Sequence, residues 1–302
     1  MTKEAHETTS VDPAAAFEEI LSKDLLKLSF KDRNNIQEEI HGVRCLAPEE
    51  TPRLLEDSLR KLAIEIDEVI PDSQKQAYLR GLERPVSAAY INGRDFRLRF
   101  LRTELFDHKK AARRLVKVCE YLLRLFGTYA LERPIQISDF TNAELKVIRK
   151  GRVQILPFRD RSGRRIAIIF PGAEFMKEEE SDNRNRVREL QMKIFIYMSY
   201  VIGSDTESQR SGIVFIVWFE TKLGTSASPD VRRIHTGLRS HQIAMVRASA
   251  IHICSPDTPF YRLQRSLLLL GIGSNRSRLR IHLGEYFEIT DSQLSTPFSA
   301  LS

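Results

Sequence analysis

The second half of the chain contains five short apolar runs separated by longer segments of helical period. The runs are VQIL (153–156), RIAIIF (165–170), IVFIVWF (213–219), AIHIC (250–254) and RLRIHL (278–283). The helical patterns between them cover about 184–202, 230–246 and 259–270. Continuous apolar runs that alternate with helices are typical of strands buried under helices. We therefore expect an α/β layer domain over 131–290.

The first half of the chain has apolar residues at helical spacing and clear helix boundaries. We expect one helix over 31–41, ended by Gly42, and another that begins at Thr51 with Pro52 in its first turn. The second helix places five residues on one face: Leu55, Leu59, Leu62, Ile66 and Val69. The sequence thus predicts a helical region over 21–130 and loose tails at 1–20 and 291–302.

Residues 95–115, DFRLRFLRTELFDHKKAARRL, carry seven Lys or Arg against three acids. This excess of four is more than half of the net charge of +7 of the whole chain. Leu98, Leu101 and Leu105 predict a first helix, and Asp107 caps a second that continues to Gly127. Lys110, Arg113, Arg114 and Lys117 fall away from the apolar face of the second helix, so we expect them on its outer side.

A helix that reads DNA bases is short and exposes Asn, Gln or Arg after a tight turn. The long apolar face after Asp107 does not fit that pattern, so no nucleic-acid partner is expected. The sequence pI near 9.3 still favours acidic partners, either phosphates or an anionic membrane surface.

Cysteine usage and hydropathy indicate a cytoplasmic protein. Cys45, Cys119 and Cys254 lie far apart and form no CxxC motif, as expected for reduced, mostly buried thiols. The N-terminal residues carry acids and no signal-peptide core, and the apolar runs are much shorter than the ~20 residues of a membrane span. We expect a soluble monomer, able to bind peripherally to membranes.

Signatures of catalysis are absent from the sequence. No GxxxxGK[ST] loop, GxGxxG turn or GxSxG elbow is present. His252 and Cys254 share a strand face, but two ligands do not make a zinc site. We expect no catalytic residue, no metal and no cofactor, and Cys254 is interpreted as a core residue.

The run at 213–219 is apolar on both faces of its strand. Ile213, Phe215, Val217 and Phe219 alternate with Val214, Ile216 and Trp218. If helices cover only one side of the sheet, the other side needs a cover or a ligand. The residues alone leave two alternatives open, complete packing by protein or a cavity for an apolar molecule.

Five segments, in order, resemble the CRAL-TRIO lipid-binding family, which includes cellular retinaldehyde-binding, tocopherol-transfer and phosphatidylinositol-transfer proteins. FRLRFLRTELFDHKKAARRLVKV (96–118) is similar to the N-terminal motif of that family. GRVQILPFRDRSGRRIAII (151–169) resembles its first strand pair, and SQRSGIVFIVWFET (208–221) its central strand. MVRASAIHICSPDTPFYRLQRSLLLLG (245–271) resembles the strand and mobile gate helix, and RSRLRIHLG (276–284) the closing strand.

The resemblance implies a helical N-terminal subdomain over about 90–130 and a sheet with a gate helix that encloses one hydrophobic molecule or phospholipid. Strand alternation and the family pattern together select the candidate cavity residues. These are Ile168, Phe170, Ile213, Phe215, Val217, Phe219, Ile251, Ile253, Phe260, Leu263, Leu267 and Leu270. The candidates for headgroup or membrane contact are Arg247, Arg265, Lys110, Arg113, Arg114 and Lys117.

Where members of the family usually have Tyr-Pro-Glu-Arg, this chain has Ala244-Met245-Val246-Arg247. Specificity for phosphatidylinositol is therefore not implied. The leading interpretation is a non-enzymatic protein that binds a lipid and transfers it between membranes. The alternative is an interaction module of the same fold whose cavity is filled by large side chains such as Phe170, Phe215, Trp218 and Phe219.

Overall fold

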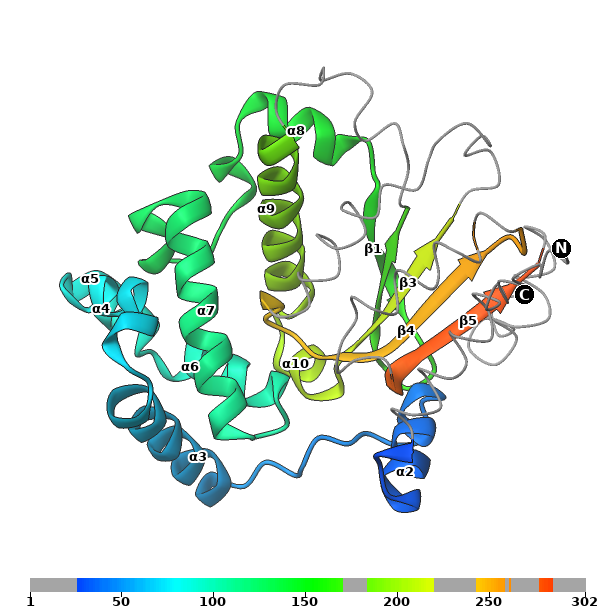
Figure 1. Cartoon of the computed structure of the whole chain (residues 1–302), viewed down its shortest axis with the longest axis horizontal. Helices are drawn as coiled ribbons and strands as arrows, with labels where there is room; N and C mark the ends of the chain where they lie inside the picture. Colours follow the sequence, from blue (N-terminus) through cyan, green and yellow to red (C-terminus); the bar gives the residue numbers. More distant parts are fainter. Residues whose placement is uncertain (1–25, 171–183, 220–242, 259–260, 262–276, 285–302) are drawn as a thin grey trace, which may run out of the picture.

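The computed structural model describes residues 26–170, 184–219, 243–258, 261 and 277–284 (Figure 1). A helical body and a five-stranded mixed sheet lie on either side of helix α9, Arg184–Ile202 (Figure 1). The protein therefore belongs to the α/β class, as the sequence predicts. No helix in the described ranges has the length and hydropathy to cross a membrane.

The helical body is formed by the elements that precede the sheet. They are α3 (Pro52–Ile64), η1 (Glu65–Val69), η2 (Asp72–Gln74), α4 (Gln76–Leu82), α5 (Pro85–Ile91), α6 (Arg94–Thr103), α7 (His108–Phe126), η3 (Thr128–Leu131), η4 (Ile137–Asp139) and α8 (Asn142–Arg149). The predicted caps of α3 and α7 are confirmed, because Thr51 Oγ1 accepts from the Leu54 amide at 3.2 Å and an Asp107 oxygen from the Lys110 amide at 3.0 Å. One continuous apolar core joins these helices to α9.

Helix α2, Phe30–Ile40, stands apart from the other N-terminal helices and lies against the sheet (Figure 1). Its residues Ile36 and Ile40 pack with Ile166, Val214 and Ala250 of three neighbouring strands. The helix ends where predicted, with Gly42 in the left-handed region at φ 72°. The first helix in the described part of the chain therefore belongs structurally to the sheet.

The strands follow one another across the sheet in the order in which they occur in the sequence. They are β1 (Val153–Arg159), β2 (Arg165–Ile169), β3 (Ile213–Trp218), β4 (Ala248–Ser255) and β5 (Leu279–Leu283). β1 is antiparallel to β2, and every later pair is parallel. All five predicted strands are present, and the helix predicted over 184–202 is confirmed as α9. Of the helix predicted over 230–246, residues 243–246 are described and are not α-helical.

The two faces of the sheet have different helical neighbours. On the α9 face, Ile202 packs with Ala167 and Ile213, and Phe215 borders this cluster. On the α2 face, Ile40 packs with Ile166, Val214 and Ile216. The short helix α10, Thr206–Ser211, connects α9 to β3 and contacts α6. Side chains that alternate along one strand therefore meet two distinct environments.

Arginines of the basic stretch join the helical body to the sheet domain. Arg102 donates from Nε and Nη2 to the two oxygens of the Glu50 carboxylate, at 2.8 and 2.9 Å, and from Nη1 to the Gln209 side-chain oxygen at 2.8 Å. Arg99 lies over the Tyr200 ring, 4.1 Å from its centroid, and donates to the Tyr200 carbonyl. These buried guanidinium groups do not face solvent.

Glu39, near the C-terminal end of α2, is the acceptor for a cluster of buried arginines. Its carboxylate pairs with Arg247, Nη1 to Oε1 at 2.6 Å, and with Arg278. Arg164 donates to the Glu39 carbonyl at 2.5 Å and to the Ile40 carbonyl at 3.3 Å. The three arginines come just before β4, β5 and β2, so one helix end holds the starts of three parallel strands.

Substitution Glu39→Gln removes the only carboxylate charge that pairs with Arg247 and Arg278 among the described residues. Loss of one partner from a buried ion pair leaves uncompensated charge and costs about 3–5 kcal/mol. We expect the free energy of unfolding in urea to fall by that amount. The matched control is Glu56→Gln, whose partner Arg94 lies 3.4 Å away with both side chains exposed, and its cost should stay below about 1 kcal/mol. Equal losses of stability in the two variants would show that the Glu39 ion pairs contribute no more to the fold than an exposed pair does.

Candidate functional site

The α9 face carries six of the eight predicted cavity residues that the structure describes. The parallel register aligns Phe215 with Ala167 and Ile251, and Val217 with Ile169 and Ile253. Ile213 lies on the same face of β3. Strand alternation therefore places the candidates of β3 and β4 together, as the sequence predicts.

Solvent reaches side chains in the middle of this face. Phe215, Val217 and Ile251 belong to β3 and β4, and Ile169 and Ile281 belong to the strands on either side. All five are partly exposed, whereas the neighbouring Ile253 is buried. Central strands of a sheet covered by helices are normally buried on both faces. Partial exposure of contiguous apolar side chains is the property expected of a surface that receives an apolar molecule.

At the carboxyl end of β3 and β4, the α9 face is closed by aromatic rings. Phe219 is buried, and its ring centroid lies 5.7 Å from that of Tyr261. Ser255, the last residue of β4, points to the same face and is 0% exposed. Its Oγ has no hydrogen-bond partner in the described part of the chain. An unsatisfied buried hydroxyl costs about 1–3 kcal/mol, which a polar group of a bound ligand would offset.

Two predicted cavity residues lie on the other side of the sheet. Ile168 is aligned with Ile216, and it packs in the cluster of the α2 face. Phe170 follows with the same alternation, so both point away from Phe215 and Val217. Their assignment to one cavity with Phe215 and Val217 is therefore wrong. The sequence analysis placed β2 one residue out of register with β3, and a shift of one residue exchanges the two faces of a strand. Phe260, Leu263, Leu267, Leu270 and Arg265 lie outside the described residues.

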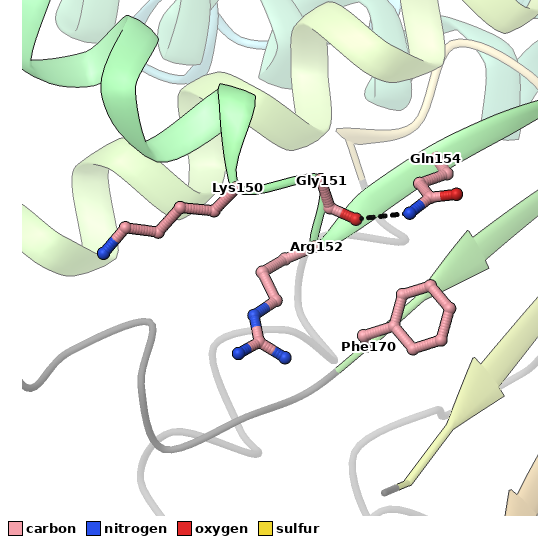
Figure 2. A pocket seen from close by; sticks show the side chains of 5 residues that line it. All are labelled: Lys150, Gly151, Arg152, Gln154 and Phe170. Carbon is pink, nitrogen blue, oxygen red and sulfur yellow. Dashed lines mark hydrogen bonds between the residues drawn. The ribbon is translucent and has the colours of Figure 1, made fainter.

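Phe170 borders a separate open pocket of about 290 Å³ on the α2 face, at the start of β1 and the end of β2 (Figure 2). The other lining residues are Lys150, Gly151, Arg152 and Gln154, and the Gln154 amide donates to the Gly151 carbonyl at 2.9 Å. Figure 2 shows the Lys150 and Arg152 side chains extending in different directions. The pocket is therefore basic with one aromatic wall, but its two cations do not converge on one point.

The predicted membrane-contact cations divide into buried and surface residues. Arg247 is 6% exposed and pairs with Glu39, and Arg114 bonds Glu104 at 2.5 Å and the Ala244 carbonyl at 3.1 Å. These interactions engage both guanidinium groups with acceptors inside the fold, and their contact with a headgroup or membrane stays a prediction.

Surface cations are nevertheless present on α7. Lys110 and Arg113 are exposed, and Lys117 is partly exposed. Lys110 Nζ lies 3.1 Å from the Asp107 carboxylate that caps the helix. The outer side of α7 is thus basic, but less so than the sequence suggests.

A histidine pair lies on the α2 face, toward β5. His252 Nδ1 and His282 Nε2 are 2.8 Å apart, and their rings stack with an angle of 19° between planes. Burial, followed by the nearby charge of His282, lowers the pKa of His252 to about 3. His252 is therefore neutral at physiological pH. The sequence analysis singled out this residue only as a neighbour of Cys254.

The thiols and carboxylates offer no assembled catalytic or metal site in the described ranges. Burial raises the pKa values of Cys119 and Cys254 to about 12, so both are inert core thiols, whereas Cys45 is exposed. No group of three His, Cys, Asp or Glu side chains in those ranges is placed to hold a metal ion.

The depressed pKa of His252 makes stability depend on pH. The unfolded chain takes up this proton below about pH 6.5, while the folded chain takes it up only near pH 3. Stability is therefore greatest above pH 6.5 and falls as the pH decreases, by up to about 1.4 kcal/mol per unit. Urea unfolding from pH 7.5 to 4.5 should show a smaller slope for His252→Asn than for the wild type. His108→Asn, at the first residue of α7, serves as the control, and an unchanged slope for His252→Asn would contradict the assignment.

No family model matches the chain, and no curated protein matches it either.

Proposed function

We propose that the protein binds one hydrophobic molecule or phospholipid on the α9 face of its sheet and carries it between membranes without chemical change. The observation that carries the proposal is the partial exposure of Phe215, Val217 and Ile251 in the middle of that face. The five sequence segments that resemble the CRAL-TRIO family support the same function, and we propose membership of that family on this basis.

The composition of the α9 face favours a largely apolar ligand. The residues aligned with the exposed positions in β2, β3 and β4 are Ile, Val, Phe or Ala. Each methylene that leaves water for such a surface contributes about 0.8 kcal/mol, so a long acyl chain supplies ample free energy for extraction from a bilayer. The buried Ser255 hydroxyl offers one hydrogen bond to a polar atom of the ligand.

Exposed basic side chains would attract the protein to an anionic membrane. Lys110 and Arg113 are exposed on α7, and each basic residue near such a surface contributes about 1 kcal/mol. This attraction is weak enough for release, as transfer between membranes requires. The protein would thus act from the cytoplasm and contact membranes transiently.

The first test is native mass spectrometry of protein purified without detergent, followed by organic extraction and lipid analysis. We expect one hydrophobic molecule per chain, either after purification or after incubation with mixed vesicles. A chain that stays free of lipid under both conditions would contradict the proposal. In that case the interaction module with a filled cavity becomes the better interpretation.

The second test locates the ligand on one face of the sheet. Val217→Phe places a larger ring in the partly exposed centre of the α9 face and should lower lipid occupancy at least tenfold. Ile168→Phe is the matched control on the α2 face and should retain the lipid. Overpacking alone costs about 1–3 kcal/mol, so thermal unfolding of both variants checks that the fold is kept. Loss of lipid only in Ile168→Phe would place the ligand on the α2 face and would contradict the proposal.

A further inference from the structure

Arg280 lies beside the histidine pair on the α2 face of the sheet. The register of β4 and β5 aligns His252 with Arg280 and Cys254 with His282. Alternation along β5 puts Arg280 and His282 on one face, and His282 bonds His252 across the strands. A guanidinium group and two imidazole rings thus occupy adjacent positions.

The charge of Arg280 has no counter-ion among the described residues. Arg278, two residues earlier, pairs with the carboxylate of Glu39. Arg280 is only partly exposed, and desolvation lowers its pKa. A partly buried cation is normally paired or hydrogen-bonded, because desolvation of an isolated charge is costly. Within the described ranges this charge is therefore unbalanced, and a bound anion would balance it.

The groups that surround His252 make this part of the sheet electropositive. The pKa of His252 is lowered first by burial and then by His282, Arg164, Arg280 and His41. These groups come from β5, from the residue before β2 and from the end of α2.

The neighbouring acids are already engaged within the protein. Glu39 holds Arg247 and Arg278, and Asp160 holds Arg164 at 2.7 Å. Neither carboxylate neutralises Arg280. The local field therefore favours an anion.

We propose that Arg280 and His252, positioned by His282, bind a phosphate group. The planar fork of arginine matches two phosphate oxygens, and hydrogen bonds to a charged acceptor are about twice as strong as neutral ones. When His282 Nε2–H donates to His252 Nδ1, the proton of neutral His252 is on Nε2, which can donate to the anion. This site does not depend on the proposed lipid function, since the apolar positions Phe215 and Val217 lie on the opposite face.

The sole tryptophan of the chain, Trp218, provides a probe for this site. It lies on the α2 face and is aligned with Cys254, which is aligned with His282. Titration of the full chain with inorganic phosphate should change Trp218 fluorescence in a saturable manner. Sodium sulfate should compete at constant ionic strength, whereas sodium chloride should not.

Variants separate a specific site from general attraction to a basic protein. Arg280→Gln should weaken phosphate binding at least tenfold, and Arg280→Lys should restore part of it. Arg113→Gln removes an equal charge from the exposed side of α7 and should leave the affinity unchanged. His282→Gln should weaken binding less than Arg280→Gln, as expected for a positioning residue. Urea unfolding confirms that each variant is folded.

A phosphate group can come from a free phosphate compound or from a lipid headgroup. Co-sedimentation with phosphatidylcholine vesicles, with and without phosphatidic acid, distinguishes the two sources. Binding of free phosphate that is lost in Arg280→Gln supports a soluble ligand. Binding only to vesicles with phosphatidic acid, again lost in Arg280→Gln, supports a headgroup. The proposal is overturned if neither probe binds, or if Arg280→Gln binds like the wild type or no worse than Arg113→Gln.

Discussion

The ion pairs of Glu39 hold together parts of the chain that are far apart in sequence. Arg247 is 208 residues from Glu39, and Arg278 is 239 residues away. Burial raises the pKa of Glu39, but attraction from Arg247 and Arg278 outweighs burial and holds the pKa below its usual value. Arg164 binds the last carbonyl groups of α2, where the helix dipole is negative. The position of α2, and with it the cover of one sheet face, depends on this cluster.

The same use of arginine explains the basic stretch of the sequence. Arg99, Arg102 and Arg114 bind Tyr200, Glu50 and Glu104, so they connect elements inside the fold. Only the remaining cations of α7, such as Lys110 and Arg113, face solvent. A positive net charge calculated from composition therefore overstates the basic surface available to a membrane or a phosphate polymer. Burial of a guanidinium with its acceptor is invisible in a count of charges.

Local patterns in the sequence predict the elements well and the contacts between them poorly. The caps at Thr51 and Asp107 and the five apolar runs depend on neighbouring residues, and the structure places them as predicted. The assignment of Ile168 to a face depends on the parallel register of β2 with β3, which aligns Ile168 with Ile216, 48 residues later in the chain. The pairing of Glu39 with arginines has no local signal, and neither has the contact of His252 with His282. Both arise from strand order, which periodicity does not specify.

The sheet divides the candidate chemistry between its faces. The α9 face is apolar, partly exposed and ends in the Ser255 hydroxyl, for which the described residues offer no hydrogen-bond partner. The α2 face is sealed by Ile36 and Ile40 near the amino ends of the strands, and toward β5 it carries Arg280 and the histidine pair. One strand supplies both environments, because Ile251 and His252 are consecutive residues that point in opposite directions.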